Sequence, residues 1–436
     1  MSETIGFWLT LFWFALTYLG LALGRLPGLR TDRAGIALVG AAGVLACGLL
    51  SFEDAVRAVD FATITLLLGM MIVVAFLRRA GFFARLAGLA MGRVRSPNAL
   101  LAVTMLLSGT LSAILVNDVV CLALTPLVLH LARRLGLDPR PHLVGLAVAS
   151  NLGSAATLTG NPQNMIIGGL SGIPYLWFAA KLAPPAALGL VIGYVVTLVA
   201  YRSALRASPP EPDKAGSKAD GQSNETSKNE GGHQENEDRI PDGKRHTALL
   251  VKSLLVTVGA VGLFFAGFPM SVVALGAAAV LLLDRIKPEK VYAQIDWGLL
   301  VMFAGLFVVV RVFEVRVLAT SGVDEWAAKA DPVWMLSGLS ATLSNLVSNV
   351  PAVLLFKPVI PAMPEAVRET AWLALALSST FAGNLTVLGS VANLIVVEQA
   401  RKEGVTIGFW DYCRVGIPVT LMTLVGGAVW LALATY

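Results

Sequence analysis

Long apolar stretches, separated by short polar segments, follow one another along almost the whole chain. Most of them approach or exceed the roughly 20 residues that a helix needs to cross about 30 Å of hydrocarbon. They lie at residues 5–23, 34–50, 61–77, 142–170, 175–201, 248–267, 270–283, 297–310, 371–397 and 415–436. This pattern predicts ten helical crossings of a membrane.

Two further apolar regions, 98–131 and 333–360, do not fit a single crossing. Polar residues interrupt each of them near its middle, at Asn117-Asp118 in the first and at Ser348-Asn349 in the second. Two full crossings with a turn would need about 40 residues, more than either region has. We therefore expect two re-entrant hairpins whose tips stop inside the bilayer. The alternative is one ordinary span followed by an amphipathic segment.

Residues 206–246 differ from the rest of the chain. Pro, Ser, Asn, Gly, Glu and Lys dominate this segment, and it has no apolar periodicity. Such a composition cannot bury enough apolar surface to order itself. It predicts a flexible linker between an N-terminal half, residues 1–205, and a C-terminal half, residues 247–436.

The two halves repeat one another with shifts of 229 to 236 positions. The matched blocks are Asp60-Phe61 with Asp296-Trp297, Thr110-Leu111-Ser112 with Thr342-Leu343-Ser344, Ser150 to Asn164 with Ser379 to Asn393, and Trp177 to Pro185 with Trp410 to Pro418. Each half holds five crossings and one hairpin, and an odd number of crossings turns the second half upside down. The sequence thus predicts an all-α polytopic membrane protein built as an inverted repeat.

Composition and charge support a membrane protein. Hydrophobic residues make up 56% of the chain, charged residues 14%, and the mean hydropathy is +0.73, which excludes a soluble globular protein. If the loop after the first stretch is cytoplasmic, 26 of the 33 Lys and Arg residues fall on that side, as the positive-inside rule requires. We expect a multi-pass protein of the inner (plasma) membrane, with a cytoplasmic linker and both termini outside. The lipid bilayer then accounts for the net charge of +5 without a nucleic acid partner.

The sequence lacks the usual marks of an enzyme or a metalloprotein. Cys47, Cys121 and Cys413 have no metal-ligand spacing and are expected to be packed thiols. No phosphate-binding Gly-x-x-x-x-Gly-Lys loop is present, and no nucleophile or general-base constellation gathers at one depth. We expect no enzymatic activity, no metal and no cofactor.

Polar residues gather at the two hairpin tips and at two glycine-containing breaks, near Gly153 and Gly160 and near Gly383 and Gly389. Broken backbone is tolerated at membrane depth only where it lines a cavity or binds a ligand. The candidate substrate- or ion-binding residues are Asn117, Asp118, Ser150, Asn151, Thr157, Thr159, Asn161, Asn164, Asn345, Ser348, Asn349, Ser378, Thr380, Asn384, Thr386, Ser390 and Asn393. A single Ser or Thr is more often bonded to its own helix, but two clusters related by a repeat favour a binding site.

Asp118 breaks the symmetry of these clusters, because its counterpart in the second half is Val350. A carboxylic acid in a partly desolvated cavity can carry a coupling proton or bind Na⁺. A salt bridge with a nearby Arg, or a cap on the hairpin tip, is the structural alternative.

Several of these motifs resemble the ion transporter superfamily. They are the tip Val116-Asn117-Asp118 followed by Leu124-Thr125-Pro126, the broken stretch Asn151 to Asn164, and the second tip Ser348 to Pro351. Within the superfamily the chain is most similar to the branch of arsenical pump membrane proteins and anion permeases. Divalent anion/sodium symporters and one class of Na⁺/H⁺ antiporters are relatives. The likeness covers nearly the whole chain outside the linker.

The resemblance implies a homodimer in which a mobile part, made of the hairpins and broken helices, moves as an elevator against a scaffold. It implies a small inorganic or organic anion or a metalloid as substrate. Our first hypothesis is export of arsenite or antimonite in exchange for H⁺, with Asp118 carrying the proton. A Na⁺- or H⁺-coupled permease for dicarboxylate, sulfate or another anion is the second, and a Na⁺/H⁺ antiporter the third. The sequence leaves open whether a cytoplasmic ATPase is a partner.

Overall fold

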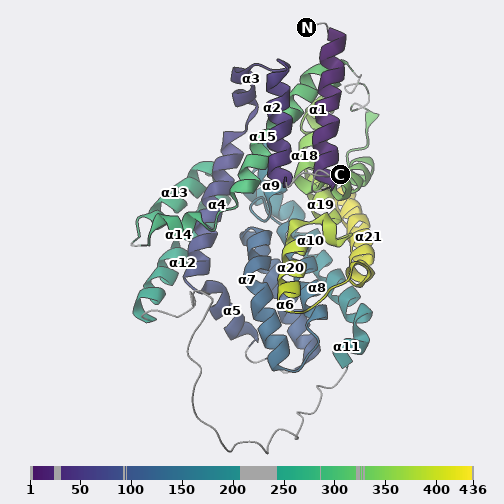
Figure 1. Cartoon of the computed structure of the whole chain (residues 1–436). Coiled ribbons are helices and arrows are strands. Elements are labelled where there is room, and N and C mark those ends of the chain that lie inside the picture. The colour runs from purple at the N-terminus through teal and green to yellow at the C-terminus, as the bar shows by residue number, and fades with distance from the viewer. Residues whose placement is uncertain are drawn as a thin grey trace, which may run out of the picture.

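The computed structural model describes residues 3–23, 31–91, 94, 96–206, 243–284, 286–320, 325, 327 and 329–434. All regular secondary structure in this part of the chain is helical (Figure 1). Seven of these helices are long and apolar enough to cross a membrane, and three shorter apolar segments accompany them. The predicted class, an all-α polytopic protein, is confirmed.

The helices of the two halves follow the same order. The first half contains α1 (Glu3–Leu23), α2 (Arg33–Ala46), α3 (Phe52–Ala58), α4 (Phe61–Arg79), α5 (Phe82–Met91), α6 (Pro97–Ile114), α7 (Asn117–Arg134), α8 (Arg140–Ser154), α9 (Pro162–Ser171), α10 (Tyr175–Ala200) and α11 (Arg202–Arg206). The second contains α12 (Gly243–Phe265), α13 (Met270–Leu282), α14 (Pro288–Tyr292), α15 (Trp297–Arg316), η2 (Leu318–Thr320), α17 (Trp334–Val347), α18 (Asn349–Phe356), η3 (Ile360–Ala362), α19 (Glu365–Ala382), η4 (Val387–Gly389), α20 (Val391–Lys402) and α21 (Phe409–Ala434). The short helices α3, α5 and α14 were not predicted.

Most of the predicted linker, residues 207–242, lies outside the described residues. The described helices α11 and α12 end and begin just inside its predicted limits, at Arg206 and Gly243. The division of the chain at residues 206 and 246 therefore stays a prediction.

Carboxylates at matched positions begin the long helices. The side chain of Asp60 accepts backbone hydrogen bonds at the start of α4, and that of Asp296 accepts one from Leu299 at the start of α15. Asp32 does the same for Gly35 in α2, at 2.8 Å. A carboxylate there pairs backbone N–H groups that the helix leaves free, and it interacts favourably with the helix dipole.

Helices from opposite halves cross closely at two matched places. The pair α2 and α15 is matched by the pair α13 and α4. A Cβ atom on Gly305 would lie 2.7 Å from the carbonyl oxygen of Ala37, and one on Gly69 would lie 2.6 Å from the carbonyl carbon of Ala274. Small residues let these backbones touch, as is common between membrane helices. The two halves are therefore interlocked.

The two predicted re-entrant hairpins are confirmed. In the first, α6 and α7 are joined by Leu115 and Val116, and in the second, α17 and α18 are joined by Ser348 alone. With eight residues at about 1.5 Å each, α18 is far too short to cross about 30 Å of hydrocarbon. The first tip ends against protein, since the backbone N–H of Asn117 donates to the carbonyl of Gly160 at 3.0 Å.

The two broken helices are also matched. The stretch 155–161 separates α8 from α9, and the stretch 383–390 separates α19 from α20. Asn161 caps α9 by accepting from the backbone N–H of Asn164 at 2.9 Å, and Ser390 caps α20 in the same way. Both breaks thus place the N-terminus of a half-helix inside the protein.

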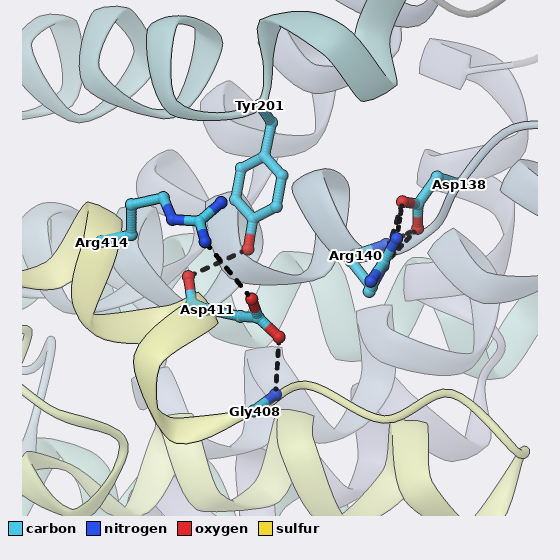
Figure 2. A network of polar contacts seen from close by, with 6 residues as sticks. All are labelled: Asp138, Arg140, Tyr201, Gly408, Asp411 and Arg414. Carbon is cyan, nitrogen blue, oxygen red and sulfur yellow. Dashed lines mark hydrogen bonds and ion pairs between the residues drawn. The ribbon is translucent and has the colours of Figure 1, made fainter.

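Polar contacts connect the ends of the two halves near α11. Tyr201 Oη, after α10, donates to the carbonyl oxygen of Asp411 in α21 at 3.0 Å, and Arg414 lies 3.9 Å from the Asp411 carboxylate (Figure 2). Beside them Arg140 pairs with Asp138 at 2.7 Å. Such exposed pairs add little stability. Of these contacts, the hydrogen bond from Tyr201 to Asp411 joins the end of α10 to the start of α21.

Candidate functional site

A cavity of about 560 Å³ lies where the two hairpin tips meet the starts of α2 and α15. It is lined by the starts of α2 and α15, the starts of α9 and α20, and both tips. The polar lining residues are Asp32, Arg33, Asn117, Asp118, Gln163, Asp296, Asn345, Ser348, Asn349 and Ser390. Six stretches that are far apart in sequence therefore converge on one space.

Asn151 is the centre of the hydrogen-bond network behind this cavity. Its Oδ1 accepts from Asn117 Nδ2 at 3.2 Å and from Ser390 Oγ at 3.0 Å. Its Nδ2 donates to Asn384 Oδ1 at 2.9 Å and to Asn393 Oδ1 at 3.0 Å. One buried amide thus joins the first hairpin tip to the broken helix of the other half.

The repeat symmetry extends to single hydrogen bonds. Asn164 Nδ2 donates to the carbonyl of Ser154, at the end of α8, at 3.3 Å and to that of Thr157 at 3.0 Å. Its counterpart Asn393 donates to the two corresponding carbonyls of the second break, at 2.7 and 3.1 Å. The two side chains therefore add matched hydrogen bonds to backbone carbonyls at the two breaks.

Matched bonds also cross between the two breaks. Asn161 Nδ2 donates to Thr380 Oγ1 at 3.2 Å, and this bond is the repeat equivalent of the one from Ser390 to Asn151. Gln163 Nε2 adds a second bond to Thr380, at 3.3 Å. The start of α9 is thereby bonded to the end of α19, and the start of α20 to the end of α8.

The structure places the predicted site residues in two layers. Asn117, Asp118, Asn345, Ser348, Asn349 and Ser390 line the cavity. The others support them from behind and are buried or nearly so: Ser150, Asn151, Thr157, Thr159, Asn161, Asn164, Ser378, Thr380, Asn384, Thr386 and Asn393. Their contact with a substrate or ion stays a prediction.

Several of these supporting residues bond to nearby helices. Ser150 Oγ donates to the carbonyl of Asn117 at 3.2 Å, and Thr157 Oγ1 donates to the carbonyl of Ala113 in the first hairpin. Thr159 Oγ1 lies 2.8 Å from Tyr175 Oη at the start of α10. These bonds join the first hairpin, the first break and α10 into one unit.

Asp118 occupies the first turn of α7, and its side chain is half-buried. Neither of the structural alternatives holds within the described residues, because no hydrogen bond or ion pair to them engages its carboxylate. The carboxylate instead faces the cavity, together with Asp32, Asp296 and Arg33. A titratable group that faces a cavity without a protein partner is free to bind a proton or a cation.

Four lining residues were not among the predicted site residues: Asp32, Arg33, Gln163 and Asp296. One of them had a signal in the sequence, since Asp296 matches Asp60 in the repeat and both precede an apolar stretch. Arg33 was assigned only to a basic loop. Its place in the cavity follows from the crossing of α2 and α15, which no local pattern indicates.

The second hairpin tip carries backbone strain. Ser348 has φ of 77° and ψ of 158°, and it is the one non-glycine residue with positive φ in the described part of the chain. This region is almost restricted to glycine, and it costs other residues about 1–3 kcal/mol. The strained residue lies on the cavity wall, next to Asn349.

Substitution of Ser348 should separate the strain from the hydroxyl group. Ser348→Gly removes both, whereas Ser348→Ala removes only the hydroxyl, so the glycine variant should be more stable than the alanine variant by about 1 kcal/mol. Thermal unfolding in detergent measures the difference. Equal melting temperatures for the two variants would show that the tip relaxes without strain in solution.

Comparisons with known proteins place the chain among transporters. The family model described as "Citrate transporter" (CitMHS) matches residues 18–382. The uncharacterized transporter Rv2685 of Mycobacterium tuberculosis is 32% identical, over 92% of this chain and 94% of its own length. The silicon efflux transporter LSI3 of Oryza sativa is 31% identical over 91% of both chains. The putative transporter arsB of Dictyostelium discoideum is 26% identical, over 92% of this chain and 87% of its own.

A solved structure has a similar fold. The YdaH transporter of Alcanivorax borkumensis matches 99% of this chain and 97% of its own, with a TM-score of 0.58 and 16% identity. At that identity the likeness concerns the fold alone. With the family match over most of its length, the chain belongs to the citrate transporter family of membrane transporters.

Proposed function

We propose that the protein is a secondary transporter that exports a small neutral metalloid hydroxide, arsenite or antimonite, in exchange for protons. The observation that carries this proposal is the charge of the cavity. Three carboxylates, Asp32, Asp118 and Asp296, line it together with one guanidinium, Arg33. When all four are ionised, an anion would enter a space of the same sign and be repelled.

A neutral hydroxide suits the rest of the lining. Arsenite at neutral pH is a trihydroxide whose O–H groups donate and accept hydrogen bonds. Amides and hydroxyls such as those of Asn117, Asn349, Ser348 and Ser390 offer both functions at the cavity wall. The relative LSI3 is named for silicon efflux, and silicic acid is also a neutral hydroxide. This name and that of arsB support the proposed class of substrate.

The direction of transport follows from the expected topology. The cavity adjoins the starts of α2 and α15, which follow basic loops that the positive-inside rule assigns to the cytoplasm. We place the protein in the inner membrane, with both termini outside. In this conformation the cavity would then open to the cytoplasm. Substrate would enter from that side, as export requires.

The interlocked halves suggest how access alternates. We assign α1, α2, α4, α12, α13 and α15 to a scaffold, and the two hairpins with the two broken helices to a mobile unit. The continuous network around Asn151 supports a unit that moves as one body. The proposal includes a homodimer with scaffolds in contact.

Flux into proteoliposomes tests the proposal. With an imposed pH gradient, arsenite should move against its own gradient, and a Na⁺ gradient should have no effect. Movement of citrate or sulfate without movement of arsenite would support an anion permease instead. Arsenite flux that ignores both gradients would indicate a channel, and Na⁺ movement without arsenite would indicate a Na⁺/H⁺ antiporter.

Arg33 distinguishes a neutral substrate from an anion. A hydrogen bond to a charged group contributes about 1.5–3 kcal/mol, so an anion held by Arg33 would lose roughly 10- to 100-fold in affinity in Arg33→Gln. For arsenite we expect less than about a threefold change in KM, because a neutral ligand does not need the charge. Initial rates over a concentration series in proteoliposomes give KM. Arg33→Lys, which keeps the charge, is the matched control.

A further inference from the structure

A second, smaller cavity adjoins the first. It has a volume of about 110 Å³ and lies between α4 on one side and α7 on the other. Asp118, Asp296 and Leu299 line both cavities. The wall of the smaller one also includes Ala75, Gln294 and Arg78, and Arg78 lies near the end of α4 with its side chain exposed. Asp118 is therefore reached from two directions.

The smaller cavity has room for water. Its wall is mainly apolar, with the polar side chains of Arg78, Asp118, Gln294 and Asp296 in it. At about 30 Å³ each, about three water molecules fit. Their polar partners are Gln294 and the carboxylates of Asp118 and Asp296.

We propose that this smaller cavity is a water-filled passage through which the coupling proton leaves Asp118 for the cytoplasmic side, separately from the substrate in the larger cavity. The inference rests on the proposed proton exchange. Each release moves one proton from the Asp118 carboxyl group along the waters to bulk water at the rim and leaves the carboxylate charged, and the reverse transfer makes it neutral. Every water on the way accepts one proton and gives up another, so one O–H bond breaks at Asp118 and one forms in bulk water.

The charges around Asp118 fit such a passage. Asp296, at the start of α15, faces both cavities, and Asp32 and Arg33 face Asp118 across the larger one. In the smaller cavity the one described cation is Arg78, and its side chain is exposed at the rim, where bulk water screens it. A proton that leaves the carboxylates therefore reaches bulk water at a hydrated rim.

Two substitutions with different physical effects test the passage. Ala75→Leu fills it from the α4 side, and Gln294→Leu removes a polar partner of the waters without adding bulk. Arsenite flux driven by a pH gradient should fall about tenfold in both. Exchange of labelled for unlabelled arsenite at equal pH, which moves no net proton, should stay at the wild-type rate. Ala75→Gly, which widens the passage, and Gln294→Asn, which keeps the amide group, should match the wild type.

The outcomes separate this inference from the proposed function. If the wild type shows no flux driven by a pH gradient, the proton exchange itself is refuted. If the wild type is coupled and Gln294→Leu keeps full coupling, the passage is refuted. An equal fall of driven flux and exchange in both variants would show an obstructed movement of the hairpins, which also overturns it. Thermal unfolding identifies a variant that fails to fold. If Ala75→Leu fails to fold, Gln294→Leu, which adds no bulk, tests the passage alone.

Discussion

Asp118→Asn should abolish arsenite transport driven by a pH gradient while leaving exchange of arsenite for arsenite intact. Asparagine has the size of aspartate but cannot take up and release a proton. The Asp118 carboxylate has no partner among the described residues, so the replacement breaks no hydrogen bond to them. We expect a fall of at least about 100-fold in driven flux, in the range of losses seen when a proton-transferring group is removed.

Asp296→Asn is the matched control for this experiment. Asp296 faces the same two cavities, and asparagine replaces aspartate well as a helix N-cap, so α15 should stay intact. If Asp118 carries the proton, the control keeps its dependence on the pH gradient. Unchanged coupling in Asp118→Asn, with coupling lost in Asp296→Asn, would instead assign the proton to Asp296.

Asn151→Ala should abolish both driven flux and exchange. The substitution leaves polar groups of Asn117, Ser390, Asn384 and Asn393 without their shared partner. Each buried group left unpaired costs about 1–3 kcal/mol, so we expect a loss of at least about 3 kcal/mol in the free energy of unfolding. Thermal unfolding and both flux assays measure these effects.

Thr104→Val provides the control for the loss of a buried polar group. Thr104 is fully buried in α6, and its hydroxyl has no partner among the described residues. Valine has nearly the same shape, so this variant should be as stable as the wild type or more so.

Wild-type transport in Asn151→Ala would show that the network does not position the tips.

The loss of exchange distinguishes the two residues. Asp118 is expected to bind the proton and little else, and its replacement uncouples transport. Asn151 lies behind the cavity and holds the parts that form it, so its replacement affects every mode of transport. The comparison of driven flux with exchange therefore separates the coupling site from its support.

The internal repeat and the interrupted apolar stretches predicted much of this fold. The hairpins and the breaks were found because polar and glycine residues interrupt apolar stretches, and such interruptions are tolerated at membrane depth only for a reason. The match of Asn164 with Asn393 indicated a shared role, and the structure shows the same pair of backbone carbonyls bound by each. The local sequence pattern was sufficient to predict this role, because each of the two amides hydrogen-bonds to carbonyls of its own break.

Contacts between the halves were not predictable in this way. Asn151 and Thr380 occupy matched positions, yet one is an amide with four bonds across the network and the other a hydroxyl that accepts from two side chains. Which polar residue meets which depends on how the two breaks approach each other. The identity of a single residue does not indicate how closely the two breaks approach.

By itself, the sequence determined the class of protein, the inverted repeat, the hairpins and the polar residues of the tips and breaks, because hydrophobic period and interruption are local properties. The tertiary structure alone decided which of those residues face the cavity. It also brought Arg33 and Asp296 to Asp118 and opened a second cavity beside it. The physical reason is that a cavity and its charge arise where several helices cross, and the crossing of α2 with α15 is set by packing between distant segments.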